Sequence, residues 1–249
     1  MPIRGRRTAA TLLALAALFL GAVLYAWHIG YPWGPVYTAV PASAAPKPAA
    51  RGTVAVFFSG DMGFNTGMGP RIVAHVAAEG IPVLGVNSLT AFAQRRSPQQ
   101  AGQLVRDTVG RALAMPGARR LLLIGQSFGA DAIVAGAQGL PEALRRRIAL
   151  VALIVPADTL SYRATPGGIA SFGDDGPSLP LARGLDWAPV LCIQGREEAH
   201  SLCPAWRQPN VRRIALPGGH FLRDDAALVA ATILHAAGAR ADRSVLHYQ

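Results

Sequence analysis

Charged residues are scarce at the start of this chain, and cysteines are scarce throughout it. Between Thr8 and Pro46 there is no Asp, Glu, Lys or Arg, and the 249 residues contain only two cysteines. No internal repeat is present, which argues against repeat architectures. The length instead suits one large α/β domain, or a smaller domain with an extension.

The uncharged stretch predicts a membrane-spanning helix within residues 1–29. From Leu12 to Ile29 the chain is almost wholly apolar, and roughly 18 apolar residues are enough to cross a bilayer as a helix. Arg4, Arg6 and Arg7 precede this run, which favours an N-terminus that stays in the cytoplasm. We therefore expect a signal anchor in the inner membrane, with the rest of the chain in the periplasm.

A cleaved signal peptide is the alternative interpretation of this segment. Ala42-Ser43-Ala44 has the small-x-small pattern of a cleavage site, and cleavage there would release a soluble periplasmic protein. The pattern lies far beyond the apolar run and past Trp27, Tyr31 and Trp33, which suit the aromatic belt of a membrane interface. A retained anchor is therefore favoured.

Basic residues outnumber acidic ones, and the net charge is +10 at pH 7. A nucleic-acid partner is not expected, because no basic motif interleaved with aromatic residues is present and the domain is predicted to be exported. The arginines are scattered, so most of them are expected to lie on solvated faces. Attraction to the anionic surface of the inner membrane fits an anchored domain better.

The two cysteines are Cys192 and Cys203. In an oxidising compartment a pair this close in sequence most simply forms one disulfide, with two unpaired buried thiols as the alternative. A zinc site that also used His200 would lack a fourth plausible ligand. We therefore expect a disulfide, and no metal or cofactor.

From Thr53 onward, short apolar runs alternate with helical patterns. The expected strands are residues 53–58, 82–86, 121–124, 149–155, 189–193 and 211–216. Strands that are apolar throughout and separated by helices predict a mostly parallel sheet with helices on both faces. We expect this compact α/β domain to span residues 52–238. Residues 30–51, rich in Pro and Ala, are expected to be a linker, and residues 239–249 a tail.

The third of these strands runs directly into Gly125-Gln126-Ser127-Phe128-Gly129, and a helical pattern of small residues follows. Gly-x-Ser-x-Gly between a buried strand and a helix is typical of a nucleophile elbow, which exposes the serine at a sharp turn. Side chains at the two glycines would collide with neighbouring backbone. An ordinary strand-to-helix turn is the alternative. The elbow predicts the α/β-hydrolase fold, with Ser127 as nucleophile.

Chain order in this fold places an acid and then a histidine after the serine. His220 follows the last strand in a glycine-rich loop and is the candidate general base. The acid should follow the preceding strand, which favours Glu198, with Glu197 as a close alternate and Asp158 as a more distant one. A carboxylate is required because it orients the imidazole and stabilises the imidazolium that forms.

An oxyanion hole needs two converging N–H groups, and the amide of Phe128 at the helix start is one candidate. The glycine-dense turn after residues 53–58 should supply the second, from Asp61 or Met62. Asp61 and Asp131 are also candidates for contact with a cationic part of the substrate. The alternative role of Asp131 is to stabilise the first turn of its helix.

Several segments together resemble the bacterial virulence protein VirJ/AcvB family. They are residues 58–64, 85–89, 124–131 and 192–195, the pair Glu197-Glu198, and residues 201–204 and 218–221, within a resemblance over about residues 52–238. The resemblance implies an exported α/β-hydrolase domain that cleaves the aminoacyl ester of aminoacylated phosphatidylglycerol, typically the lysyl form. It places the family's serine at Ser127 and its histidine at His220, and in the VirJ branch it implies an association with type IV secretion.

The sequence therefore predicts a membrane-anchored periplasmic serine ester hydrolase acting on an aminoacylated phospholipid. A second hypothesis is a periplasmic module that assists virulence or type IV secretion on a hydrolase scaffold, without catalysis or in addition to it. Its partners would be secretion-system proteins. A third hypothesis is a generic carboxylesterase or thioesterase.

Overall fold

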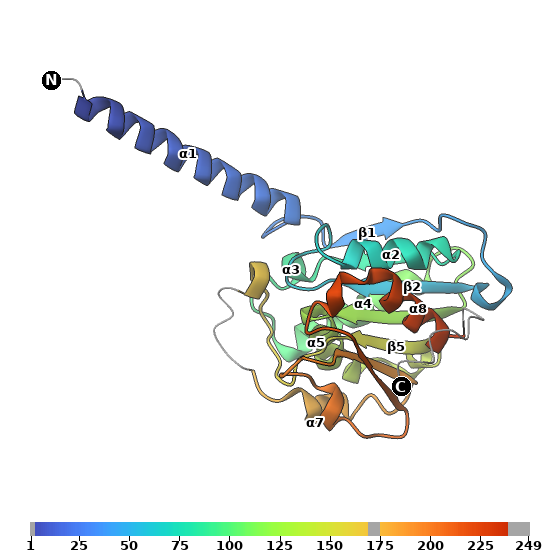
Figure 1. Cartoon of the computed structure of the whole chain (residues 1–249). Helices are drawn as coiled ribbons and strands as arrows, with labels where there is room; N and C mark the ends of the chain where they lie inside the picture. The colour runs from blue at the N-terminus through green and yellow to red at the C-terminus, as the bar shows by residue number, and fades with distance from the viewer. Residues whose placement is uncertain (1–2, 169–174, 239–249) are drawn as a thin grey trace.

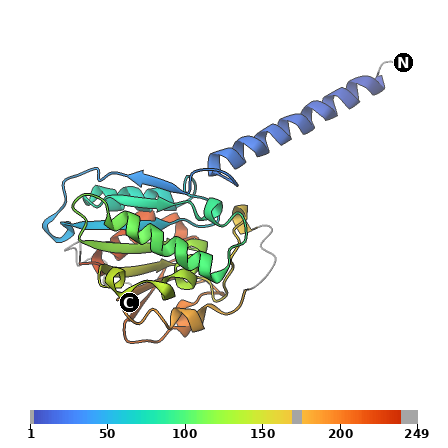
Figure 2. The same cartoon turned by 180° about the vertical axis from the view of Figure 1, so that it is seen from behind.

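The computed structural model describes residues 3–168 and 175–238, which form one α/β domain and a long helix projecting from it (Figures 1 and 2). In the described part of the chain the strands are β1 (Tyr37–Val40), β2 (Thr53–Phe58), β3 (Val83–Val86), β4 (Arg120–Gln126), β5 (Ile148–Ile154), β6 (Val190–Gly195) and β7 (Val211–Leu216). They form one sheet in the order β1-β3-β2-β4-β5-β6-β7. All neighbouring strands run parallel except β1 and β3.

The sheet is covered by helices on both faces, as the apolar strands predicted. Within the same residues the α-helices are α1 (Ile3–Ile29), α2 (Gly69–Ala78), α3 (Ser88–Ala91), α4 (Pro98–Leu113), α5 (Phe128–Gly136), α6 (Glu142–Arg145), α7 (Ser178–Ala182) and α8 (Ala226–Ala236). The 3₁₀ turns are η1 (Pro48–Ala50), η2 (Ala137–Gly139), η3 (Pro166–Gly168), η4 (Cys203–Ala205) and η5 (Leu222–Asp224). Helices α4 and α5 pack on one face, and α2 and α8 on the other.

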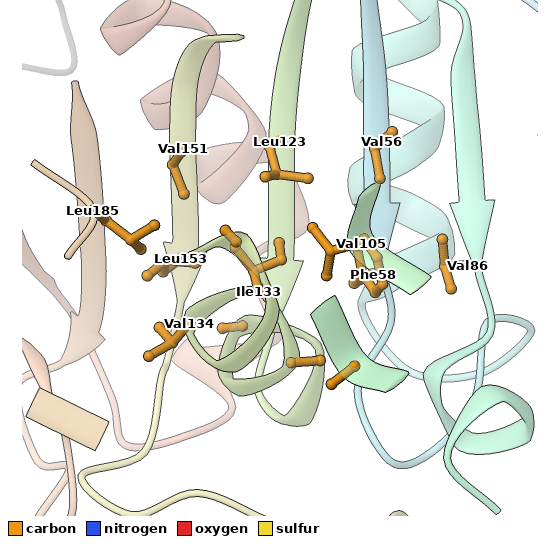
Figure 3. Close-up of a cluster of buried hydrophobic side chains, with 14 of the residues drawn as sticks. Val56, Phe58, Val86, Val105, Leu123, Ile133, Val134, Val151, Leu153 and Leu185 are labelled. Carbon is orange, nitrogen blue, oxygen red and sulfur yellow. The ribbon is translucent and has the colours of Figure 1, made fainter. Parts of the chain in front are cut away.

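Strand β4 shows how the central strands join the two cores. Leu121 and Leu123 belong to the cluster under α4 and α5, whereas Leu122 and Ile124 belong to the cluster under α2 and α8. Successive side chains of a strand point to opposite faces, so a strand buried on both sides is apolar throughout. Figure 3 shows the first of these clusters, in which side chains of α5 and of the neighbouring strands interdigitate.

The sequence predicted about six strands and a linker over residues 30–51, and here the structure differs. Residues 37–40 form β1, which pairs antiparallel with β3 at the edge of the sheet. This strand was missed because it has only four residues and lies between Pro35 and Pro41, in a stretch that resembles a linker. The boundaries of the domain at 52 and 238 stay predictions, and the predicted tail lies outside the described residues.

The projecting helix α1 contains the predicted span. Residues Thr11–Ile29 are long and apolar enough to cross a membrane, and only 6% of that stretch is buried in the protein. Its last residue behaves differently, because Ile29 is 1% exposed and belongs to the core cluster under α4 and α5. The register of β1 pairs Tyr37 with Val86, so the chain between α1 and β1 lies at the carboxyl end of β3.

Three side chains of the domain hold the end of α1. The last carbonyl groups of a helix have no partner within the helix. Here Asn65 Nδ2 donates to the carbonyl of His28 at 2.9 Å, and Asn87 Nδ2 to that of Ile29 at 2.9 Å. Thr90 Oγ1 donates to the carbonyl of Gly30 at 2.8 Å. The helix is thus bonded to the domain rather than joined to it by a free tether.

Candidate active site

Ser127 lies at the turn between β4 and α5, in the backbone conformation of a nucleophile elbow. Its φ is 51° and its ψ is −125°, a strained combination for a residue with a side chain. A Cβ atom at Gly125 would lie 2.5 Å from the carbonyl oxygen of Gly129. A Cβ atom at Gly129 would lie 2.3 Å from the carbonyl oxygen of Phe58. Both glycines are therefore required for the turn, as the motif predicted.

His220 reaches the serine from the loop after β7. Its Nε2 lies 2.9 Å from Ser127 Oγ, a hydrogen-bond distance. The preceding Gly218 has a φ of 91°, and Leu222, Arg223 and Asp224 also have positive φ values, between 48° and 60°. Three consecutive residues other than glycine in this region are unusual and indicate a tightly constrained loop around the imidazole.

Glu198 is the carboxylate that the structure brings to His220. Its Oε1 lies 2.6 Å from His220 Nδ1, and the glutamate side chain is only 6% exposed. Its Oε2 accepts a hydrogen bond from the backbone N–H of Gly195 at 3.3 Å, which fixes the carboxylate within its own turn. The structure thus contains a continuous chain of hydrogen bonds from Glu198 through His220 to Ser127.

The two alternate acids lie elsewhere. The Glu197 side chain is exposed, although its backbone N–H donates to the carbonyl of Gly218 at 3.1 Å. Asp158 pairs with His200, with 3.6 Å between its Oδ2 and the Nδ1 of that histidine, and both side chains are substantially exposed. Neither carboxylate contacts His220, so the geometry favours Glu198 over both.

The turn that carries Glu198 and the loop that carries His220 are packed backbone to backbone. A Cβ atom at Gly195 would lie 2.2 Å from the carbonyl oxygen of Gly219, so only glycine permits this approach. On its other side the acid turn is closed by the disulfide that the sequence predicted, between Cys192 on β6 and Cys203 in η4. The position of the acid therefore depends on contacts between three separate segments.

The candidate oxyanion donors surround Ser127. Phe128 is the first residue of α5, where a backbone N–H has no partner within the helix. On the other side, a Cβ atom at Gly60 would lie 3.5 Å from Ser127 Cβ, so the turn after β2 passes beside the serine. Asp61 and Met62 follow in that turn. The start of α5 and the turn after β2 therefore both lie next to the serine, and the role of their amides as an oxyanion hole stays a prediction.

A cavity of about 470 Å³ opens at the serine and is lined by Asp61, Met62, Ser127, His220 and Phe221, among others. Burial raises the pKa of Asp61, while the hydrogen bond from its own backbone N–H and the charge of His220 oppose that shift. Met62 and Phe221 belong to the few large apolar side chains that are exposed in the described part of the domain. The cavity thus combines exposed apolar side chains with two carboxylates, Asp61 and Asp224, of which Asp224 pairs with Arg71.

Asp131 does not line this cavity, which corrects its expected role in substrate contact. The residue is 7% exposed, and its Oδ1 accepts a hydrogen bond from the N–H of Ala157 at 2.9 Å. Burial raises its pKa well above the usual range, despite that hydrogen bond. Ala157 follows Val155, which has a φ of 47° at the end of β5, so Asp131 joins α5 to the strained chain beyond β5.

Two contributions to this region were not assigned from the sequence. Phe221 packs edge-on against His220, with 5.9 Å between ring centroids. In the sequence, only its position next to His220 pointed to this contact. Asn87 was not recognised as a partner of the span, because 58 residues separate it from Ile29. Within the described residues, no group of three or more His, Cys, Asp or Glu side chains is placed to hold a metal ion.

A family model of the bacterial virulence protein VirJ matches residues 52–241. The chain belongs to the VirJ family. The match covers the sheet from β2 to β7 and every residue of the hydrogen-bond chain described above, and it confirms the resemblance seen in the sequence. Among curated proteins, none matches the sequence of this chain.

Solved structures similar to this VirJ family member share its α/β-hydrolase fold. The esterase domain of a Rhodothermus marinus protein is 16% identical, with a TM-score of 0.52 over 81% of this chain and 98% of that one. Est1E from Butyrivibrio proteoclasticus is 13% identical, with a TM-score of 0.54 over 80% and 92%. XC6422 from Xanthomonas campestris, described as an α/β serine hydrolase without lid, is 15% identical, with a TM-score of 0.52 over 82% and 95%.

Proposed function

We propose that this protein is a membrane-anchored serine hydrolase that cleaves the aminoacyl ester of an aminoacylated phosphatidylglycerol, such as the lysyl form. The observation that carries the proposal is the hydrogen-bond chain from Glu198 Oε1 through His220 to Ser127 Oγ, with distances of 2.6 and 2.9 Å. A serine hydroxyl is a weak nucleophile until a neighbouring base removes its proton. The hydrogen-bond chain supports the proposal, because an imidazole that could act as this base lies next to the serine hydroxyl and a buried carboxylate lies next to the imidazole.

In the proposed reaction, Ser127 Oγ attacks the carbonyl carbon of the ester and its proton passes to His220 Nε2. The bond from that carbon to the glycerol oxygen then breaks, and the released alcohol takes the proton from His220. Water, activated by the same imidazole, attacks the aminoacyl-serine and frees the amino acid. Glu198 holds the imidazole in the tautomer that presents Nε2 to the serine, and stabilises its positive charge.

The tetrahedral intermediate carries negative charge on the former carbonyl oxygen. We assign its stabilisation to the N–H of Phe128 and to a second N–H from the turn after β2, from Asp61 or Met62. Both residues follow Gly60 in the turn that passes beside Ser127.

The cavity supports an aminoacyl lipid as substrate. The carboxylate of Asp61 can pair with the ammonium group of an aminoacyl ester, and it approaches His220 closely enough to sense its charge. Met62 and Phe221, both exposed at the rim, present apolar surface to the remainder of a lipid. Exposed apolar side chains around a cavity are typical of lipid or membrane contact.

We propose that α1 is retained as an anchor in the inner membrane and that the domain lies in the periplasm. Cleavage at Ala42-Ser43-Ala44 would remove β1 from the sheet and Ile29 from the core. It would also expose the unpaired edge of β3, which invites aggregation. The contacts at the end of α1 thus favour the anchor over a cleaved signal peptide.

Turnover of lysyl-phosphatidylglycerol in mixed micelles, by the purified full-length protein, tests the proposal. We expect Ser127→Ala to lower the release of lysine at least about 10³-fold, because the nucleophile is lost while binding is kept. Ser43→Ala removes a serine hydroxyl from an exposed position that does not line the cavity and serves as the matched control, with a rate near that of the unaltered protein. Equal rates for Ser127→Ala and the unaltered protein would contradict the proposed nucleophile.

Generic ester hydrolysis is the second candidate, and the names of two structural neighbours favour it, an esterase domain from Rhodothermus marinus and the carboxylesterase CesB from Bacillus subtilis. It predicts comparable kcat/KM values for short acyl esters and for the aminoacyl lipid. An aminoacyl-lipid hydrolase should prefer the lipid, and Asp61→Asn should reduce that preference. The association with secretion-system proteins implied by the family remains a prediction, and labelling of Ser127 by a fluorophosphonate probe would separate a catalytic protein from a purely accessory one.

A further inference from the structure

A second cavity lies beside the end of the membrane helix, separate from Ser127. Its volume is about 450 Å³. Its walls include Tyr31, Pro32 and Trp33 from the chain after α1, Arg95 and Arg96 from the segment between α3 and α4, and Gln100 from the first turn of α4. The cavity is thus bounded on one side by aromatic residues of the chain between α1 and β1, and on the other side by two arginines. Nothing in the proposed reaction uses it.

Arg96 is held in place by its surroundings while the end of its side chain remains available. Its Nε donates to the carbonyl of Ala91 at 2.6 Å, and its guanidinium lies over the Phe92 ring, 5.5 Å from the centroid. No residue in the described ranges, 3–168 and 175–238, is bonded to its two terminal nitrogens. Arg95 differs, because its guanidinium pairs with Asp175. Arg96 therefore presents to the cavity a guanidinium that is already held in place and is not paired with a carboxylate of the described residues.

The cavity lies close to the end of the proposed span. Trp33 is four residues beyond Ile29, at most about 14 Å away even in an extended chain. The N–H of Gly34 donates to the carbonyl of Gly30 at 2.7 Å, so the chain turns back and the real separation is shorter. Trp33 is 91% exposed, as expected of an aromatic side chain at the level of the lipid headgroups.

We propose that this cavity binds the phosphodiester of an anionic phospholipid headgroup, with Arg96 as its principal ligand. A fixed guanidinium with two free nitrogens matches the geometry of two phosphate oxygens. The inference rests on the membrane location proposed above. The cavity is linked to the candidate active site by direct packing, because Phe92 beneath Arg96 contacts Phe128 edge-on, with 5.1 Å between ring centroids.

The test titrates short-chain phosphatidylglycerol into the full-length protein in an uncharged detergent and follows its binding. Short-chain phosphatidylcholine and inorganic phosphate are titrated in parallel. We expect phosphatidylglycerol to bind about tenfold more tightly than either, and Arg96→Gln to raise its Kd about tenfold, which is the loss of one charge-assisted contact. Arg96→Lys should have an intermediate effect, because it keeps the charge but loses the planar fork.

Arg106→Gln is the matched control, since it removes the same charge from an exposed position on α4. Its Kd for phosphatidylglycerol should stay within about twofold of the unaltered protein. An unchanged Kd in Arg96→Gln would overturn the proposal. Binding of inorganic phosphate as tight as that of phosphatidylglycerol would overturn the assignment to a lipid.

Kinetics then distinguish the two sources of the phosphate. If the site holds the phosphate of the substrate itself, Arg96→Gln raises KM for lysyl-phosphatidylglycerol and leaves hydrolysis of a neutral soluble ester unchanged. If it holds a separate lipid, added phosphatidylglycerol alters the rate without competing with the substrate. Binding that depends on Arg96 in a protein without esterase activity would refute the proposed function and support this site.

Discussion

The two halves of the active site are held in place by different means. The nucleophile half is local: β4, Ser127 and α5 are contiguous, and the turn is defined by glycines that permit backbone contact with the strand beside it. The other half joins distant segments. Glu198 and His220 come from separate loops, which are held by a backbone contact at Gly195 and by the disulfide between Cys192 and Cys203.

This difference shows where precision comes from in each half. The serine is positioned by steric exclusion, which acts through the backbone and leaves few alternatives. The imidazole is positioned by hydrogen bonds and by packing of one loop on another, so it is more sensitive to a single side-chain change. Changes to the glycines of the nucleophile half should therefore mainly lower the stability of the fold. Changes in the half that holds Glu198 and His220 should mainly lower the catalytic rate.

The largest effect is expected at the acid. Glu198→Gln keeps the size of the side chain but removes the charge that orients His220, so kcat/KM for ester hydrolysis should fall roughly 10³- to 10⁴-fold. The unfolding transition should change little. Glu197→Gln is the matched control, because that side chain is exposed and does not contact His220, and it should retain nearly full activity. A larger loss in Glu197→Gln than in Glu198→Gln would reverse the assignment of the acid.

The elbow should show the opposite behaviour. Gly129→Ala places a methyl group 2.3 Å from the carbonyl oxygen of Phe58, which cannot move without disturbing β2. We expect the free energy of unfolding to fall by about 3 kcal/mol, the upper part of the usual range for overpacking. Gly110→Ala in α4 meets nothing within 4 Å and should instead stabilise the protein by about 0.5–1 kcal/mol. Urea denaturation of both variants measures the contrast, and equal stabilities would refute it.

The smallest effect is expected at Asp131, which joins α5 to the chain beyond β5. Its folded-state pKa is raised, so between the unfolded value near 3.8 and that raised value the folded protein binds more protons than the unfolded one. This residue therefore makes stability fall as pH rises through that window. Asp131→Asn keeps an oxygen for the N–H of Ala157 but cannot ionise. Its stability relative to the unaltered protein should increase with pH across the window and then level off.

Denaturation at several pH values measures this trend, with Asp107→Asn at an exposed position of α4 as the baseline. Parallel pH profiles for Asp131→Asn and the unaltered protein would show that the buried carboxylate does not contribute. Ester hydrolysis by Asp131→Asn should remain close to that of the unaltered protein, because the residue does not line the cavity at Ser127.

The sequence was informative wherever a constraint is local. Strands β2 to β6 are buried along most of their length, so their runs of apolar residues could be recognised in the sequence. Strand β7 is only partly buried and contains two arginines, and its remaining apolar residues were enough to predict it. The elbow could be predicted because the whole motif is contiguous in the sequence, although Gly125 is required by contacts within the turn and Gly129 by the backbone of β2. The choice between Glu197 and Glu198 could not be settled in the same way, since it depends on which side chain turns toward a histidine 22 residues further along the chain.

Long-range contacts account for most of what the sequence did not reveal. Strand β1 has only four residues and is recognisable as a strand only because it pairs with β3. Asp131 has the pattern of a residue near a helix start, and only the tertiary structure places Ala157 over its carboxylate. The bonds from Asn65, Asn87 and Thr90 to the end of α1 likewise join segments that no periodicity relates.

Those three bonds have a consequence for the reach of the protein. A domain on a free linker could swing and engage lipids over a wide radius, including lipids of an apposed membrane. With α1 as the anchor proposed above, these bonds limit how far the domain can swing away from its helix. It would search by lateral diffusion within one leaflet, and would serve the membrane in which it resides rather than a neighbouring one.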